Sequence, residues 1–235
     1  MIHFYFFLVG STVASFLGLV VDRFPEQSII VPSSHCNACG QKLAPRDLVP
    51  VLSQLINRLR CRFCQSKIPI RYLMLELVGS LLFLATSLSY LTISQLVLLI
   101  MGITLALYDQ REQEYPILIW LFFHLLLLFL VGFNLLMTIF LALGILAHFV
   151  DLRIGAGDFL FLASCSTIFN LTEVLLIIQI ASIIGLLLFG LKSKKDRLAF
   201  VPCLFCGSSI LIMIQFIVLH QNALRLFESC FTKNL

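Results

Sequence analysis

Residues 117–150 read ILIWLFFHLLLLFLVGFNLLMTIFLALGILAHFV and contain no Asp, Glu, Lys or Arg. An uncharged apolar run of this kind is typical of membrane helices, and about 20 such residues cross the hydrocarbon core of a bilayer. We divide the stretch into two candidate spans, residues 117–133 and 135–150. The stretch therefore predicts two consecutive helices inside a membrane.

The other parts of the chain have the same apolar character. Of its 235 residues, 60% are hydrophobic and 12% are charged, and the mean hydropathy is +1.04. A soluble domain is usually about 45–50% apolar. Further candidate spans are residues 4–21, 73–90, 93–108, 159–170, 172–191 and 203–221. We predict an all-α integral membrane protein, a polytopic bundle of about eight spans, without a nucleic-acid partner and with no oligomeric state assigned.

Two of these segments differ from an ordinary span. The first, residues 4–21, resembles a signal peptide in length, but it lacks a basic leader and a small-residue cleavage site. We therefore interpret it as a span that is retained. The run at 159–170 is short, so we expect a partial or tilted element there.

The basic residues are distributed unevenly between the two sides of the membrane. With eight spans and the N-terminus outside, the loops at 22–72, 109–116, 151–158 and 192–202 face the cytoplasm. Fourteen of the sixteen Lys and Arg residues fall in these loops, and only Arg225 and Lys233 do not. Because loops rich in Lys and Arg stay in the cytoplasm, this distribution predicts a multi-pass protein with its N-terminus outside.

The loop at 22–72 is the only sizeable polar segment, and it contains two CxxC pairs. They lie in SHCNACGQKL (34–43) and LRCRFCQSKI (59–68), and their thiols are those of Cys36, Cys39, Cys61 and Cys64. Two CxxC pairs at this spacing are typical of a tetrahedral zinc site. The alternative is a pair of disulfides, which a reducing cytoplasm disfavours. We predict a structural zinc whose binding supplies much of the folding energy of the loop.

Two aspartates stand at the cytoplasmic ends of their predicted spans. Asp109 ends the third span, and Asp158 begins the sixth, directly after Gly155 and Gly157 in the sequence GAGD. Two carboxylates at close range share a proton, so one can act as a base toward water and the other as an acid toward an amide nitrogen. The glycines let a peptide approach closely. Alternatively, Asp109 is a solvated residue at a helix end and Asp158 a plain N-cap.

Three further residues stand out in apolar surroundings. Glu76 lies one turn inside the second span, where it is either a structural polar partner or a contact for a positive charge of the substrate. Cys203 and Cys206 form a third CxxC pair, which we interpret as incidental, since free Cys behaves as a small hydrophobic residue. The chain has no Gly-x-Ser-x-Gly or His-Glu-x-x-His motif, which argues against a serine hydrolase or a zinc metalloprotease.

Taken together, these motifs resemble the type IV prepilin peptidases, the Gly-x-Gly-Asp membrane aspartyl proteases, and most of all their Gram-positive competence type. The segments that carry the resemblance are ASFLGLVVDRFP (14–25), the two cysteine segments (34–55 and 60–77), YDQREQEYP (108–116) and GAGD (155–158). Gln54 stands where the family often has Trp. The combination is more specific than any one of its motifs.

The resemblance implies a bacterial cell-membrane enzyme with its active site facing the cytoplasm. Asp109 and Asp158 would form the catalytic pair, with Gly155 and Gly157 as active-site backbone. The substrate would be the helix of a prepilin or pseudopilin, cut after a glycine. Many bacterial members of the family also methylate the new N-terminal amine with S-adenosylmethionine, which would be the cofactor if this activity is present. The expected divisions are a first span (1–21), a zinc loop (22–72), a peptidase core (73–221) and a tail (222–235). The alternative is a non-enzymatic membrane scaffold or transporter whose zinc loop docks a partner.

Overall fold

The computed structural model describes residues 1–150, 155–191 and 199–232, without the side chains of residues 191, 219, 220 and 222–232. Within these ranges the regular structure is helical, apart from two isolated bridges, His35 with Lys42 and Arg60 with Lys67. The helices are α1 (Ile2–Arg23), η1 (Pro45–Asp47), α2 (Leu52–Ile56), α3 (Ile70–Ser87), α4 (Ile93–Glu112), α5 (Ile117–Val131), α6 (Leu135–Phe149), α7 (Ala156–Ile168), α8 (Leu171–Leu191) and α9 (Val201–Thr232).

The predicted all-helical membrane fold is confirmed. Each of the eight apolar segments is a helix, and five of these helices in the described residues are long and apolar enough to cross a membrane: α1, α3, α4, α8 and α9. The other three have 13 to 15 residues. A 13-residue helix is about 20 Å long, against a hydrocarbon core of about 30 Å. The predicted short element is thus α7.

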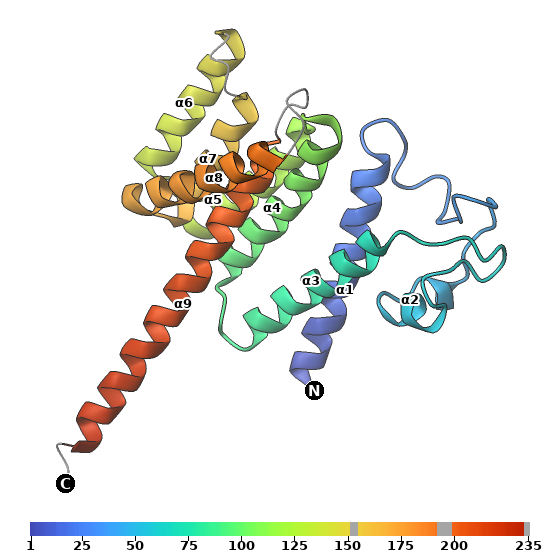
Figure 1. The fold of residues 1–235 in the computed structure, drawn as a ribbon, viewed down its shortest axis with the longest axis horizontal. Coiled ribbons are helices and arrows are strands. Elements are labelled where there is room, and N and C mark those ends of the chain that lie inside the picture. The colour runs from blue at the N-terminus through green and yellow to red at the C-terminus, as the bar shows by residue number, and fades with distance from the viewer. Residues whose placement is uncertain (151–154, 192–198, 233–235) are drawn as a thin grey trace. The chain divides into compact units, whose positions relative to one another are not determined.

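Residues 1–96 form one compact unit. In it α1 packs against α3, and Figure 1 shows the two helices crossing. A Cβ added at Gly10 would lie 2.6 Å from the carbonyl oxygen of Gly79, and one added at Gly79 would collide with Ala14. Small residues thus let the two backbones come into contact, as is common between helices in lipid. The polar loop with η1 and α2 belongs to the same unit.

Residues 97–235 form the second compact unit, which is arranged around α7. This helix packs against α5, α6, α8 and α9 (Figure 1). Residues 161–167 are all buried, although the helix is shorter than any of its neighbours in the unit. The first unit thus includes the segment 73–96, whereas the division expected from the sequence assigns this segment to the peptidase core.

The outer helices of the second unit carry their large apolar side chains on the surface. Phe129 in α5 and Phe149 in α6 are 87% and 81% exposed. Such a surface suits lipid, which also requires that backbone polar groups be satisfied inside the helices. α9 continues to Thr232, eleven residues beyond the end of the predicted span. Residues 151–154 and 192–198, which carry five of the counted basic residues, lie outside the described residues.

Candidate active site and metal centre

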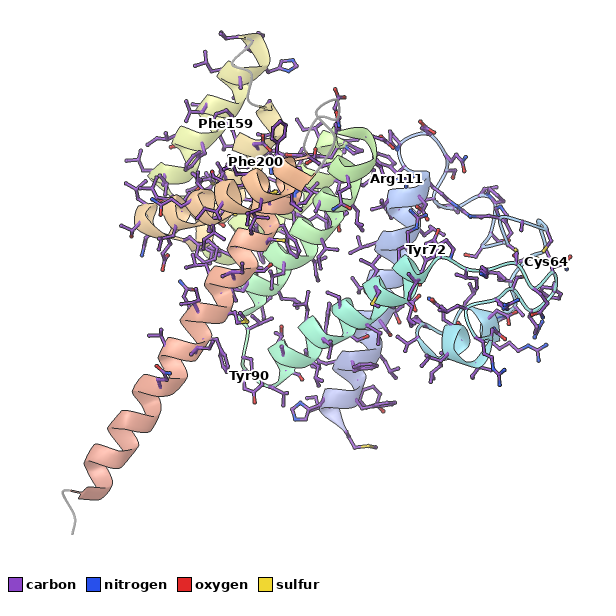
Figure 2. All side chains as sticks on the ribbon, viewed as in Figure 1. Cys64, Tyr72, Tyr90, Arg111, Phe159 and Phe200 are labelled. Carbon is purple, nitrogen blue, oxygen red and sulfur yellow. The ribbon has the colours of Figure 1, made fainter. Side chains whose placement is uncertain are left out.

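The four cysteines of the polar loop converge on one point. Their Sγ atoms all lie within 4.8 Å of one another, and those of Cys36 and Cys64 are 3.8 Å apart. A tetrahedral zinc with Zn–S bonds of about 2.3 Å needs neighbouring sulfurs about 3.8 Å apart. The predicted cluster is therefore present and could hold a metal ion. Figure 2 labels Cys64 at the far end of this loop.

Two similar turns hold the cysteines in place. In the first, the N–H of Gly40 donates to the carbonyl of Cys36 at 2.8 Å, and in the second the N–H of Gln65 donates to that of Cys61 at 2.9 Å. Gly40 and Gln65 occupy equivalent positions, with φ of 69° and 60°. Each C-x-x-C segment therefore forms the same kind of hydrogen-bonded turn.

The thiols of this cluster differ in acidity. The backbone N–H groups of Cys39 and Ala38 lower the pKa of the Cys36 thiol to about 6. The N–H of Gln41 favours the Cys39 thiolate, yet burial and the neighbouring sulfurs raise the pKa of Cys39 to about 11. Four thiolates cannot coexist at this range without a compensating cation, which is what a divalent metal would supply.

Glu76 connects the polar loop to α3. Its Oε2 accepts hydrogen bonds from the backbone N–H of Val51 and from Nε2 of Gln54, each at 2.7 Å. Glu76 is 4% exposed, and its carboxyl group also contacts the hydroxyl of Ser15. These neutral donors favour the structural alternative for Glu76. Gln54 thus has a structural role as a donor to Glu76. It stands at the position where the type IV prepilin peptidases often have Trp.

Asp109 lies in the last turn of α4, where the first residue of α9 meets it. Its Oδ2 accepts a hydrogen bond of 3.0 Å from the backbone N–H of Val201, and the side chain is 8% exposed. The N-terminus of a helix has unsatisfied N–H groups and the positive end of the helix dipole, so it stabilises a carboxylate. Asp109 is therefore not a solvated residue at a helix end.

Asp158 lies in the first turn of α7. Its N–H donates to the carbonyl of Gly155 at 3.0 Å, and its carboxylate faces the N–H of Gly155. The N-cap of α7 is Gly155, so Asp158 is not the plain N-cap that the alternative supposed. Each of the two aspartates thus sits against the N-terminus of a helix.

The two carboxylates lie at the same end of the second unit. Asp109 and Asp158 are within electrostatic range of each other, and both are within range of the Tyr115 phenol and the Cys203 thiol. Figure 2 labels Arg111, two residues after Asp109, Phe159, directly after Asp158, and Phe200, directly before Val201. Cys203, interpreted from the sequence as incidental, is in fact a buried neighbour of this acidic pair.

Sequence reasoning missed two parts of this site. The N–H of Val201 is a backbone group, and its only sequence signal is Pro202, because Pro is favoured in the first turn of a helix. Tyr115 carried no signal beyond its place before Pro116. Its hydroxyl donates to the carbonyl of Gly157 at 2.6 Å.

A buried polar cluster lies deeper in α5 and α7. Nε1 of Trp120 donates to the carbonyl of Leu160 at 2.9 Å and to the hydroxyl of Ser164 at 3.0 Å. Nδ1 of His124 lies 2.9 Å from the same hydroxyl, and its ring stacks on Trp120. The cluster joins the middle of α7 to α5, and it thereby also holds the helix whose first turn carries Asp158.

Comparison with known proteins finds several proteins that are similar to this chain. The model of the bacterial peptidase A24 N-terminal domain matches residues 8–90, which lie within the first compact unit. A prepilin leader peptidase/N-methyltransferase of Bacillus subtilis is 27% identical over 226 residues, which are 86% of this chain and 90% of that protein. No solved structure matches.

Two further relatives match more closely over shorter stretches. A prepilin leader peptidase/N-methyltransferase of Myxococcus xanthus is 38% identical over 118 residues, which are 48% of this chain and 35% of that protein. A type 4 prepilin-like proteins leader peptide-processing enzyme of Escherichia coli is 37% identical over 98 residues, 34% of this chain and 36% of that protein. The matched part of the chain thus spans about a third of each of these two relatives.

The fold and these matches together define the class. The protein is an all-helical membrane protein whose residues 8–90 match the model of the bacterial peptidase A24 N-terminal domain. It is related to the prepilin leader peptidases, and the resemblance predicted from the motifs is thereby confirmed.

Proposed function

We propose that this protein is a membrane aspartic endopeptidase that removes the leader peptide of type IV prepilins or pilin-like pseudopilins. The names of its relatives support this proposal. The observation that carries it is that Asp109 and Asp158, 49 positions apart in sequence, each lie against a helix N-terminus and are within electrostatic range of each other. A non-enzymatic scaffold needs no such pair.

The chemistry follows from the proximity of the two acids. Mutual repulsion disfavours two charges, so one carboxyl keeps its proton while the other is ionised. The ionised carboxylate takes a proton from a water molecule as the water oxygen attacks the scissile carbonyl. The protonated carboxyl then gives its proton to the leaving amide nitrogen as the C–N bond breaks. We propose Asp109 and Asp158 for these roles and leave open which is ionised first.

We propose that the substrate is an apolar helix preceded by a short leader, cut after a glycine at the cytoplasmic face. Both acids lie at helix ends beside short connections, and the predicted orientation places these ends at the cytoplasm. At that level the leader remains in water while the apolar helix remains in lipid. Gly155, where an added Cβ would meet only the carboxyl group of Asp158, leaves room for a peptide backbone beside that carboxyl.

We propose zinc as the metal of the four cysteines and assign it a structural role. The donor set is four sulfurs, which are the usual ligands of a closed zinc site. The cluster belongs to residues 1–96, and both aspartates belong to residues 97–235. A four-sulfur site has no open position for water, so zinc would stabilise the fold of the loop.

A second activity, methylation of the new N-terminal amine with S-adenosylmethionine, belongs to the same proposal. It is supported by the names of the relatives, several of which are called N-methyltransferases. We assign no residue of this chain to the methyl transfer.

The test is to change each acid alone, Asp109→Asn and Asp158→Asn, in cells that make a candidate prepilin. We expect each variant to leave the precursor uncut, because removing one member of an acid–base pair costs about 10²- to 10⁴-fold in rate. Gel mobility and the N-terminal sequence of the pilin measure cleavage, and its mass reports an added methyl group.

The matched control is Glu112→Gln, an exposed acid one turn from Asp109 on α4. This variant should process the precursor as the unchanged protein does, and all variants should reach the membrane in equal amounts. Processing that continues in cells with either Asn variant would refute the catalytic role of Asp109 and Asp158.

A further inference from the structure

Tyr115 lies in the short connection between α4 and α5, and its hydroxyl reaches across to the turn before Asp158. The hydroxyl donates a hydrogen bond of 2.6 Å to the carbonyl oxygen of Gly157. Gly157 is 42 positions away in sequence and is the residue directly before Asp158. The contact therefore joins the loop that follows one aspartate to the turn that carries the other.

The ring of Tyr115 also fills the space where a side chain at position 157 would be. A Cβ added at Gly157 would lie 2.9 Å from Cε1, 3.0 Å from the hydroxyl oxygen and 3.1 Å from Cζ of Tyr115. Distances this short force one of the groups to move. A Cβ at Gly155, by contrast, would approach Asp158 Oδ2 only to 3.4 Å, an ordinary contact. Of the two glycines of this motif, the one packed against Tyr115 is thus the more restricted.

The surroundings of the phenol keep it a hydrogen-bond donor. Burial, and after it the negative charges of Asp158 and Asp109, raise the pKa of Tyr115 far above its usual value. The hydroxyl is therefore protonated at neutral pH. Tyr115 is unsuited to take up a proton-transfer role of its own, but it is well suited to hold a backbone carbonyl.

We propose that Tyr115 is a positioning residue for Asp158, and that its ring is the reason why residue 157 is a glycine. The hydroxyl fixes the Gly157 peptide, and the ring blocks rotation of the turn toward the α4–α5 connection. This inference rests on the proposed peptidase function, which it extends to a residue that the sequence motifs did not include.

The expected effect on catalysis follows from geometry. A catalytic group displaced by about 1 Å loses about 10²-fold in rate, and the Gly157 peptide is directly bonded to the Cα of Asp158. Loosening that peptide should therefore reduce kcat. Binding of an apolar substrate helix depends on other surfaces, so KM should change little.

The first experiment is Tyr115→Phe, which removes the hydroxyl and keeps the ring. We expect kcat for prepilin cleavage to fall about 10- to 100-fold, with KM within about twofold and an unchanged amount of protein in the membrane. Tyr5→Phe, at an exposed position on α1, is the matched control and should cleave normally. A Tyr115→Phe variant with unaltered kcat would overturn the positioning role of the hydroxyl.

The second experiment is a double-mutant cycle of Gly157→Ala and Tyr115→Ala, read out both by cleavage and by the thermal midpoint in detergent. Gly157→Ala alone should lower kcat about 100-fold or more and lower the midpoint by several degrees. In the Tyr115→Ala background the same change should cost little in either measurement, because the clash is gone. Gly190→Ala, where a Cβ meets nothing within 4 Å, controls for a new methyl group.

The two readouts separate this inference from the proposed function. Equal losses of thermal midpoint on Gly157→Ala in both backgrounds would overturn the contact, whatever the protein cleaves. A protein that cleaves no prepilin, but shows the midpoint coupling, would refute the peptidase proposal while the contact of Tyr115 with Gly157 stands.

Discussion

Gly40 and Gln65 are two residues in the same backbone conformation with unequal suitability for it. Each follows the second cysteine of its pair, and each closes a hydrogen-bonded turn with positive φ. Glycine adopts this region freely, whereas a residue with a side chain pays about 1–2 kcal/mol. The residue in the first turn, Gly40, therefore suits the positive φ, whereas Gln65 in the second turn is strained by it.

We predict opposite effects on metal retention for changes at these two positions. Gly40→Ala should weaken metal binding by about 1 kcal/mol, or about fivefold, because a Cβ there meets no neighbour within 4 Å and only the backbone is strained. Gln65→Gly should strengthen it by about 0.5–1 kcal/mol, after the entropy that glycine loses on folding is subtracted. Competition with a chelator measures both, since folding of the loop and zinc binding are coupled. A loss on Gln65→Gly would contradict this account.

At the scale of elements, the site depends on where helices begin. α9 begins at Val201, whose N–H donates to Asp109. α7 begins at Ala156, and the N–H of its N-cap Gly155 faces Asp158. Two helix N-termini near two carboxylates favour the negative charge that one of them must carry. Neither the sequence around Asp109 nor the GAGD segment by itself indicates that each acid lies against the start of a helix.

The change Val201→Pro tests the contribution of α9. Proline is favoured at the first position of a helix, so α9 should still form, but the N–H that donates to Asp109 is removed. We expect kcat for cleavage to fall about 10- to 10³-fold, corresponding to one lost preorganised donor. The control is Val201→Ala, which keeps the N–H and shortens a buried side chain. If the alanine variant loses as much activity as the proline variant, packing accounts for the effect and the hydrogen bond does not.

At the scale of the whole molecule, the question is on which side of the membrane each end of a helix lies. The structure supplies helices long enough to span a membrane, and the distribution of basic residues predicts their direction. α5 is shorter than those helices, but the sequence predicts a span at residues 117–133. Residue 114 precedes α5 and residue 133 follows it, so the predicted topology places the two on opposite sides.

Cysteines introduced at the two ends of α5 provide a test of this orientation. Both positions are exposed, Glu114 before the helix and Phe133 after it. In intact cells, a membrane-impermeant thiol reagent should label Phe133→Cys and leave Glu114→Cys unlabelled until the cells are lysed. The unchanged chain gives the background from its native cysteines. The reverse pattern would place the proposed active site outside the cell and contradict the predicted topology.

The sequence alone determined the existence and approximate extent of the helices. In hydrocarbon a backbone must satisfy its hydrogen bonds locally, so a long apolar segment has few choices other than a helix. The segment 117–150 became α5 and α6, and the short run at 159–170 became α7. The cysteine cluster was predictable for a similar reason, because C-x-x-C turns are local and their spacing already brings two sulfurs together.

Only the tertiary structure decided which side chains face one another. A helix that is apolar all round, such as α5, has no stripe that indicates which face packs against protein. The contacts of Tyr115 with Gly157 and of Val201 with Asp109 therefore had no signal in the order of residues. The same holds for Glu76, whose donors come from a loop some 25 positions earlier. Hydrogen bonds between residues close in sequence determine the helices. The site depends on how the helices pack, and this packing is determined by the shapes of side chains, small ones included, that are far apart in the sequence.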